Sequence, residues 1–174
     1  MKLKNLLGIL FAVAIFSVAA SAQLPSLANV GDDLFTSEED GFEIAVPDGC
    51  MAMTQATTVR TYRCDLVEGL ILITVEERAK AITSDEGIRA YTQGVKEGFE
   101  NSAKTKLSES PAKIGEYKGY SFTGKMGEDK VILISLLWEK MVVTILGRAN
   151  ATVPNSDAKI LKAVSSFAFN SDDK

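Results

Sequence analysis

The segment Lys130–Gly147, KVILISLLWEKMVVTILG, decides the fold of this chain. Its first half, Val131–Leu137, is apolar at every position except Ser135, and its second half, Met141–Leu146, is apolar except at Thr144. Each run is too short for an independent helix and is rich in β-branched residues, so the segment predicts a β-hairpin. Because apolar side chains would point to both faces of these strands, other parts of the chain must cover both faces.

Further strands are predicted on either side of this hairpin. Gly41–Val46 alternates apolar and polar residues, and Pro47-Asp48-Gly49 ends that strand. Cys50–Thr58 is expected to be a loop of small residues. The remaining predicted strands are Val59–Leu66, Gly69–Glu77, Lys113–Ile114 and Tyr117–Thr123.

A long helix is predicted between these groups of strands. Thr83 and Glu86 have the spacing of a capping box, and apolar residues follow at intervals of three and four as far as Ala103. Gly94 and Gly98 share one face of this helix and would allow it to approach the sheet closely. Pro111 is expected to close the helical segment, and a last helix is expected to start near Pro154-Asn155-Ser156-Asp157 and to carry an apolar stripe ending at Phe167.

This order of elements predicts an α/β (α+β) fold, with a mainly antiparallel sheet of about seven strands and helices packed on its faces. We expect a single domain over residues 41–169. An extended N-terminal arm, residues 23–40, would precede it, and a polar tail, residues 170–174, would follow it.

The first 22 residues have the pattern of a secretory signal peptide. Lys2 and Lys4 precede an apolar run, Leu6–Ala20, and Ala20-Ser21-Ala22 has the small-residue form of a cleavage site. The alternative is a membrane anchor, but the run is shorter than the ~20 residues that span a bilayer. We therefore expect cleavage after Ala22, a secreted or periplasmic protein, and no stable membrane anchor after cleavage.

Composition narrows the classes of function. Cleavage removes two of the 19 basic residues and none of the 23 acidic ones, which leaves a net charge of −6 and disfavours nucleic acid or anionic lipid as a partner. The chain has no histidine, so Ser-His-Asp systems and the common zinc sites are excluded. We expect a protein that is not an enzyme, with no catalytic residues, no cofactor and no metal.

The two cysteines, Cys50 and Cys64, both lie in the mature chain. In an exported protein such a pair predicts a disulfide, and the closed loop of about 15 residues would contribute ~3 kcal/mol of stability. The alternative is a copper(I) site made of these cysteines with Met51 and Met53, because soft sulfur ligands suit that ion.

One further motif is a chance match. Gly119–Lys125 has the G-x4-G-K part of a phosphate-binding loop, but Met126 stands where Ser or Thr would bind magnesium. The segment also alternates like a strand, and no helix follows it to receive the phosphates.

Four segments together resemble a known fold. They are Gly41–Pro47, Gly115–Gly119, the hairpin Lys130–Gly147 and a last helix ending near Phe167. This layout is similar to small secreted bacterial proteins of the PsbP-like sandwich fold, which also includes an extrinsic subunit of photosystem II and a Ran-binding nuclear import factor. The resemblance implies a sandwich that binds partners, and no family catalytic residue maps onto this chain.

We therefore expect an exported, non-enzymatic binding or interaction module that docks on another envelope or secreted protein. One alternative is a carrier of a small apolar ligand held between sheet and helix, which needs a cavity of ~300 Å³ or more. Another is a carboxylate-based hydrolase, which needs two acids that converge in a cleft.

The first prediction concerns the N-terminus. Material exported by the native host is expected to begin at Gln23, because the cleavage pattern ends at Ala22. N-terminal sequencing measures this directly. Recovery of a chain that retains Lys2 and fractionates with membranes would contradict the signal peptide.

Overall fold

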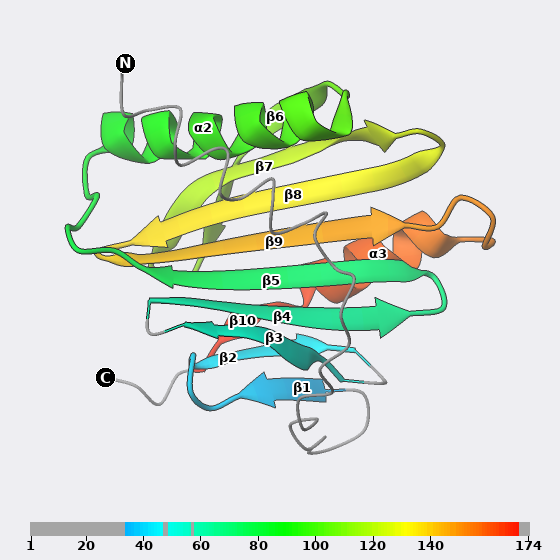
Figure 1. The fold of residues 1–174 in the computed structure, drawn as a ribbon, viewed down its shortest axis with the longest axis horizontal. Helices are drawn as coiled ribbons and strands as arrows, with labels where there is room; N and C mark the ends of the chain where they lie inside the picture. The colour runs from blue at the N-terminus through cyan, green and yellow to red at the C-terminus, as the bar shows by residue number, and fades with distance from the viewer. Residues whose placement is uncertain (1–33, 47–48, 57, 171–174) are drawn as a thin grey trace.

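The computed structural model describes residues 34–46, 49–56 and 58–170 of the chain. Seven strands form one antiparallel sheet in the order β3-β4-β5-β9-β8-β7-β6 (Figure 1). The predicted mixed fold, with a seven-stranded antiparallel sheet, is therefore correct at this level. The strands are β3 (Met51–Ala56), β4 (Val59–Leu66), β5 (Gly69–Glu77), β6 (Leu107–Ile114), β7 (Tyr117–Met126), β8 (Asp129–Trp138) and β9 (Met141–Ala149).

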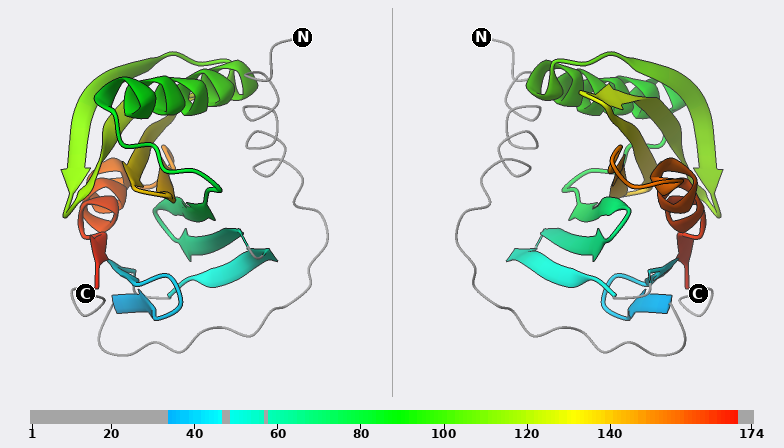
Figure 2. Two further views of the ribbon diagram at one scale, coloured as in Figure 1. Left: turned by 90° about the vertical axis from the view of Figure 1, so that its left-hand side faces the viewer. Right: turned by 90° about the vertical axis from the view of Figure 1, so that its right-hand side faces the viewer.

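A second, smaller sheet and two helices complete the described part of the chain. The small sheet has the order β1-β2-β10, and its strands are β1 (Leu34–Ser37), β2 (Phe42–Ala45) and β10 (Ala168–Phe169). The helices are α2 (Asp85–Ala103) and α3 (Ser156–Ser165). Seen from its two sides in Figure 2, the large sheet is a strongly curved layer.

The β8–β9 hairpin is buried on both of its faces, as its apolar runs require. Leu133 is fully buried in a cluster with Phe99 of α2. Its neighbour Ile134 points to the opposite face and is buried in a cluster with Val164 of α3. Helix α2 contacts β7 and β8, whereas α3 contacts β9 and β5. The small sheet packs on the same side as α3. The aromatic residues in this cluster are Phe35, Phe42, Tyr62 and Phe167.

A buried polar network joins the small sheet to the large one. The Tyr62 hydroxyl on β4 donates to the Asp40 carboxylate at 2.5 Å and lies 3.0 Å from the Ser37 hydroxyl of β1. Asp40 also pairs with Arg60, and its side chain is fully buried. The expected signal peptide and residues 23–33 of the expected N-terminal arm lie outside the described residues. From Leu34 onward the arm forms β1, and Phe35 is buried in the core. Strand β1 has only four residues, which are too few to show a clear alternation of apolar and polar residues.

Two predictions around the sheet edges are wrong. The expected loop Cys50–Thr58 contains β3. Pairing with β4 in a short hairpin makes these residues a strand, although their composition is typical of a loop. Pro111 does not close the helical segment but lies within β6. Since β6 is the last strand of the sheet, the missing N–H of Pro111 is tolerated there.

The helix details differ from expectation at two points. Ser84, not Thr83, caps α2, and its hydroxyl accepts from the Gly87 amide at 3.1 Å. Gly94 is exposed, and a Cβ built on it would meet nothing within 4 Å, so it does not mediate a close approach to the sheet. On β9, by contrast, Gly147 is buried, and a Cβ there would lie 2.9 Å from methyl groups of Ile132, Ile160 and Val164.

A pair of glycine substitutions tests this packing. Gly147→Ala is expected to destabilise the protein by about 1–3 kcal/mol, because β-branched side chains of β8 and α3 must move to admit one methyl group. Gly94→Ala is the matched control, and is expected to stabilise the protein by about 0.5–1 kcal/mol, since alanine is the better helix former. Urea denaturation measures both. Equal effects of the two changes would show that α3 does not press on β9 at Gly147.

Candidate functional site

One face of the large sheet is only partly covered. The register places Met51, Arg63 and Leu72 side by side across β3, β4 and β5, in the same row as the buried Leu146 of β9. Near β9 this face is covered by the cluster that contains Phe99 of α2 and Leu133. Toward the edge, Leu72 is half-buried and Met51 is 39% exposed. We call the uncovered part the open face. Its members are Met51, Thr61, Arg63, Leu70, Leu72 and Thr74.

A row of hydroxyl side chains runs along this face. Ser135 and Thr144, the polar exceptions in the two apolar runs, lie directly opposite each other on β8 and β9. Thr74 and Thr61 continue the row onto the open face, where their hydroxyl oxygens are 3.3 Å apart. Within the described residues, the fully buried Ser135 hydroxyl has no hydrogen-bond partner. The row therefore runs from the buried interior of the sheet to the partly exposed open face.

The open face ends at strand β3, an edge of the large sheet. Its sequence, MAMTQA, contains neither a charge nor a proline. The other edge strand, β6, carries Glu109, Pro111 and Lys113, which are the devices that discourage pairing with a further strand. A bulge between Ala52 and Thr54 interrupts the pairing of β3 with β4, after which the register is regular again. The bulge itself discourages further pairing, but β3 lacks the charged residues and the proline that also protect β6.

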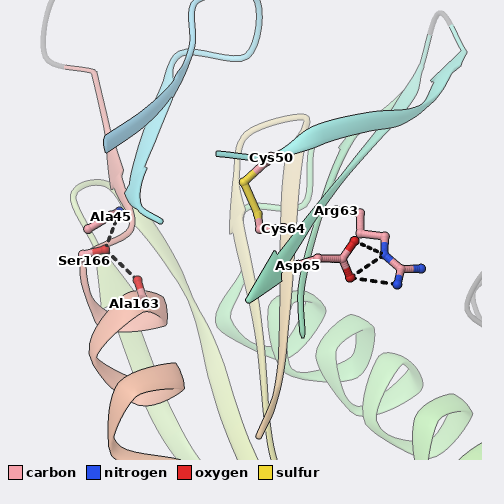
Figure 3. The surroundings of a disulfide bond; sticks show 7 residues. All are labelled: Ala45, Cys50, Arg63, Cys64, Asp65, Ala163 and Ser166. Atoms are coloured by element: carbon pink, nitrogen blue, oxygen red, sulfur yellow. Dashed lines mark hydrogen bonds and ion pairs between the residues drawn. A yellow bond between two sulfur atoms is a disulfide. The ribbon is translucent and has the colours of Figure 1, made fainter. Parts of the chain in front are cut away.

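The predicted disulfide between Cys50 and Cys64 is present and lies at the start of β3. Both residues are buried, so the bond fixes the edge strand to β4 from inside the core (Figure 3). The alternative copper(I) site needed both cysteines as free thiolates, and the disulfide removes these two ligands. Among the residues that the structure describes, no group of three or more potential metal-binding His, Cys, Asp or Glu side chains occurs.

The arginines of β4 point to opposite faces, as their odd spacing predicts. Arg63 forms hydrogen bonds of 2.8–2.9 Å with Asp65 on the open face, and Figure 3 shows both side chains on the side of β4 away from Cys64. Arg60 pairs with Asp40 beneath the opposite face. The open face therefore carries a neutralised ion pair beside apolar and hydroxyl groups.

Two of the tyrosines with raised pKa values, Tyr62 and Tyr91, donate hydrogen bonds to carboxylates. Burial, followed by the hydrogen bond to Asp40, raises the pKa of Tyr62 to about 12. Burial also raises the pKa of Tyr91, together with the charge of Glu76, whose carboxylate accepts from the Tyr91 hydroxyl at 2.9 Å. Both phenols are neutral at physiological pH, and their hydrogen bonds join separate elements of the fold. Neither is a candidate nucleophile or general base.

A small hollow lies between the first turn of α2 and strands β6 and β7. It has a volume of about 330 Å³. A Cβ at Gly119 would lie 1.9 Å from the Ser135 carbonyl oxygen, so glycine is required where β7 approaches β8 beside the hollow. The lining residues are Asp85, Ile88, Pro111, Ala112, Lys113, Lys118, Gly119 and Tyr120.

Comparisons with known proteins give no function. No protein-family model matches the chain, and no curated protein matches its sequence. A crystal structure from Bacteroides thetaiotaomicron VPI-5482, determined at 1.50 Å resolution, resembles the chain with a TM-score of 0.46 and 13% sequence identity. The match covers 82% of this chain and 50% of that protein, so this chain spans about half of its length. Neither described helix has the length and apolar character that a membrane crossing requires.

Neither the open face nor the β3 edge was predicted from the sequence. Residues 51–56 combine two methionines, two alanines, a threonine and a glutamine, which is a weak strand signal. The signal that could have revealed β3 is its position between Cys50 and the strand that contains Cys64. A disulfide across such a short loop favours an antiparallel hairpin.

Proposed function

We propose that this protein is an exported, non-enzymatic interaction module that binds an extended segment of another envelope or secreted protein. The segment adds as a strand to the outer edge of β3, with which no described strand pairs. The observation that carries the proposal is that β3, a strand with neither charge nor proline, forms an edge of the large sheet beside the open face. Unpaired backbone groups on such an edge are a template for one more strand.

Strand addition at β3 would use both the backbone and the open face. The backbone of the added strand would pair with the outer edge of β3, and every second side chain would lie beside Met51. Leu72 and Thr61 extend the same surface with apolar and hydroxyl groups, which suit uncharged side chains of a partner. The disulfide holds Cys50 in place before binding, which lowers the entropy lost when the complex forms.

Export is supported by the residues themselves. The disulfide is typical of an oxidising compartment. The apolar run Leu6–Ala20 and the small-residue cleavage pattern after it are typical of a secretory signal peptide. The PsbP-like sandwich, with helices packed on the faces of the sheet, belongs to the same proposal and is supported by the contacts of α2 and α3 with different strands. Proteins of the PsbP-like fold bind partners, in agreement with an interaction role.

A non-enzymatic role is supported by the chemistry of the side chains. The chain contains no histidine, which is the most frequent general acid or base at neutral pH. The buried carboxylate of Asp40 is occupied by Tyr62 and Arg60. Glu76 is similarly occupied by Tyr91 and Arg78. These acids stabilise contacts between elements.

The proposal is tested by site-specific photo-crosslinking in the native host. A benzophenone amino acid replaces Met51 at the β3 edge or, as the matched control, Leu161 on α3. Both are exposed apolar side chains, at 39% and 51%. Position 51 is expected to yield one adduct with a different protein, and position 161 none. Adding Ala56→Lys is expected to abolish the adduct, because a lysine on an edge strand disfavours pairing.

Three outcomes would contradict the proposal. Adducts of equal yield at positions 51 and 161 would indicate non-specific contact. An adduct of twice the mass of this chain would show that the edge pairs with a second copy instead of a partner. An adduct that persists in the Ala56→Lys variant would show that the partner contacts Met51 without adding a strand to β3.

A further inference from the structure

Two pairs of lysines face each other across neighbouring strands of the large sheet. Lys125 lies opposite Lys130 on β7 and β8, and Lys113 lies opposite Lys118 on β6 and β7. Like charges in directly opposite positions destabilise an antiparallel pair. In the first pair, Lys130 forms an ion pair with Asp157 at the start of α3, which offsets the repulsion.

The second pair has no such compensation. In the described part of the chain, no carboxylate oxygen lies within 4 Å of the side-chain nitrogen of Lys113 or of Lys118. Both residues, which are exposed, line the hollow between α2 and strands β6 and β7. Two exposed lysines therefore lie in directly opposite register positions at an open hollow, and neither forms an ion pair with a described carboxylate.

The rest of the hollow indicates what an occupant looks like. Ile88, Pro111 and the ring of Tyr120 provide an apolar wall. Asp85 also lines the hollow and disfavours a second anionic group in the occupant. The volume of about 330 Å³ lies at the lower end of the range of small-molecule sites. An apolar body with a single oxyanion fits these features.

We propose that this hollow binds a small amphipathic oxyanion, a carboxylate or phosphate attached to an apolar body. The oxyanion accepts charge-assisted hydrogen bonds from Lys113 and Lys118 and relieves their mutual repulsion. The apolar body lies against Ile88 and Tyr120. This site is distinct from the proposed partner edge, because β6 and β3 are opposite ends of the sheet order. The lysines also exclude a wholly apolar ligand from this hollow, since its burial would desolvate them without a partner.

The inference is tested by NMR titration of the isotopically labelled mature protein with phenyl phosphate, benzoate and benzyl alcohol. Phenyl phosphate and benzoate are expected to shift the amides around Gly119 saturably, and the more tightly bound of the two identifies the preferred oxyanion. Benzyl alcohol, which lacks the charge, is expected to shift them without saturation. In the Lys113→Gln/Lys118→Gln variant the affinity for both anions is expected to fall about tenfold or more, because both charged donors are lost.

The control variant is Lys125→Gln/Lys162→Gln, which removes the same charge at exposed lysines that do not line the hollow. It is expected to bind both anions as the wild type does. Equal weakening in the two variants would mean general charge attraction and would overturn the inference, as would an absence of saturable shifts in the wild type. The melting temperature without any added ligand provides a second, independent test. The melting temperature of the Lys118→Gln variant is expected to exceed that of the wild type, and an unchanged or lower value would show that the lysines do not repel each other.

Discussion

The β8–β9 hairpin imposes the constraint on which the rest of the structure depends, because it is apolar toward both faces. Leu133 and Ile134 point in opposite directions and are both buried. No strand pair with this sequence can lie at a surface, since one full row of apolar side chains would then face water. Strands β5 and β7 extend the hairpin sideways, while residues of α2 and α3 join the clusters on its two sides. The chain folds so that the most apolar segment of its described part is enclosed.

On the face with Leu133, cover by α2 decreases from the hairpin toward β3, and that gradient places the open face. The side with Ile134 receives α3 and the small sheet, which is fastened by the network of Tyr62, Asp40 and Arg60. The side with Leu133 receives α2 and becomes half-exposed beyond β9. The open face and β3 lie at the end of this gradient, and the hollow lined by Lys113 lies near the other edge of the sheet. The two proposed interactions therefore lie near opposite ends of the strand order.

The parts of the fold that follow from burial could be predicted from the sequence, and those that depend on tertiary partners could not. The two apolar runs predicted β8 and β9, and the cysteine pair predicted its disulfide. Strand β1 was missed because it is short and because Phe35 is buried by residues of other strands, including Phe42 and Tyr62. Strand β3 was missed because its hairpin partner, not its own composition, makes it a strand. The lysine pair at 113 and 118 needed the register of β6, which Pro111 concealed.

The most direct test of the central constraint is the stability of Ile132→Asp and Leu133→Asp, measured by thermal unfolding. Leu133 is fully buried, whereas Ile132 is only partly buried, although the apolar run predicted complete burial for both. Ile132 nevertheless packs against the core cluster that contains Ile160 and Val164 of α3, so both substitutions are expected to cost several kcal/mol, with Leu133→Asp the more severe. Val67→Asp, at a position that is 77% exposed, is the control and is expected to leave the melting temperature nearly unchanged. Severe loss at both hairpin positions supports a hairpin enclosed on both faces; a nearly silent Ile132→Asp would show that one face is open to solvent and would contradict the account.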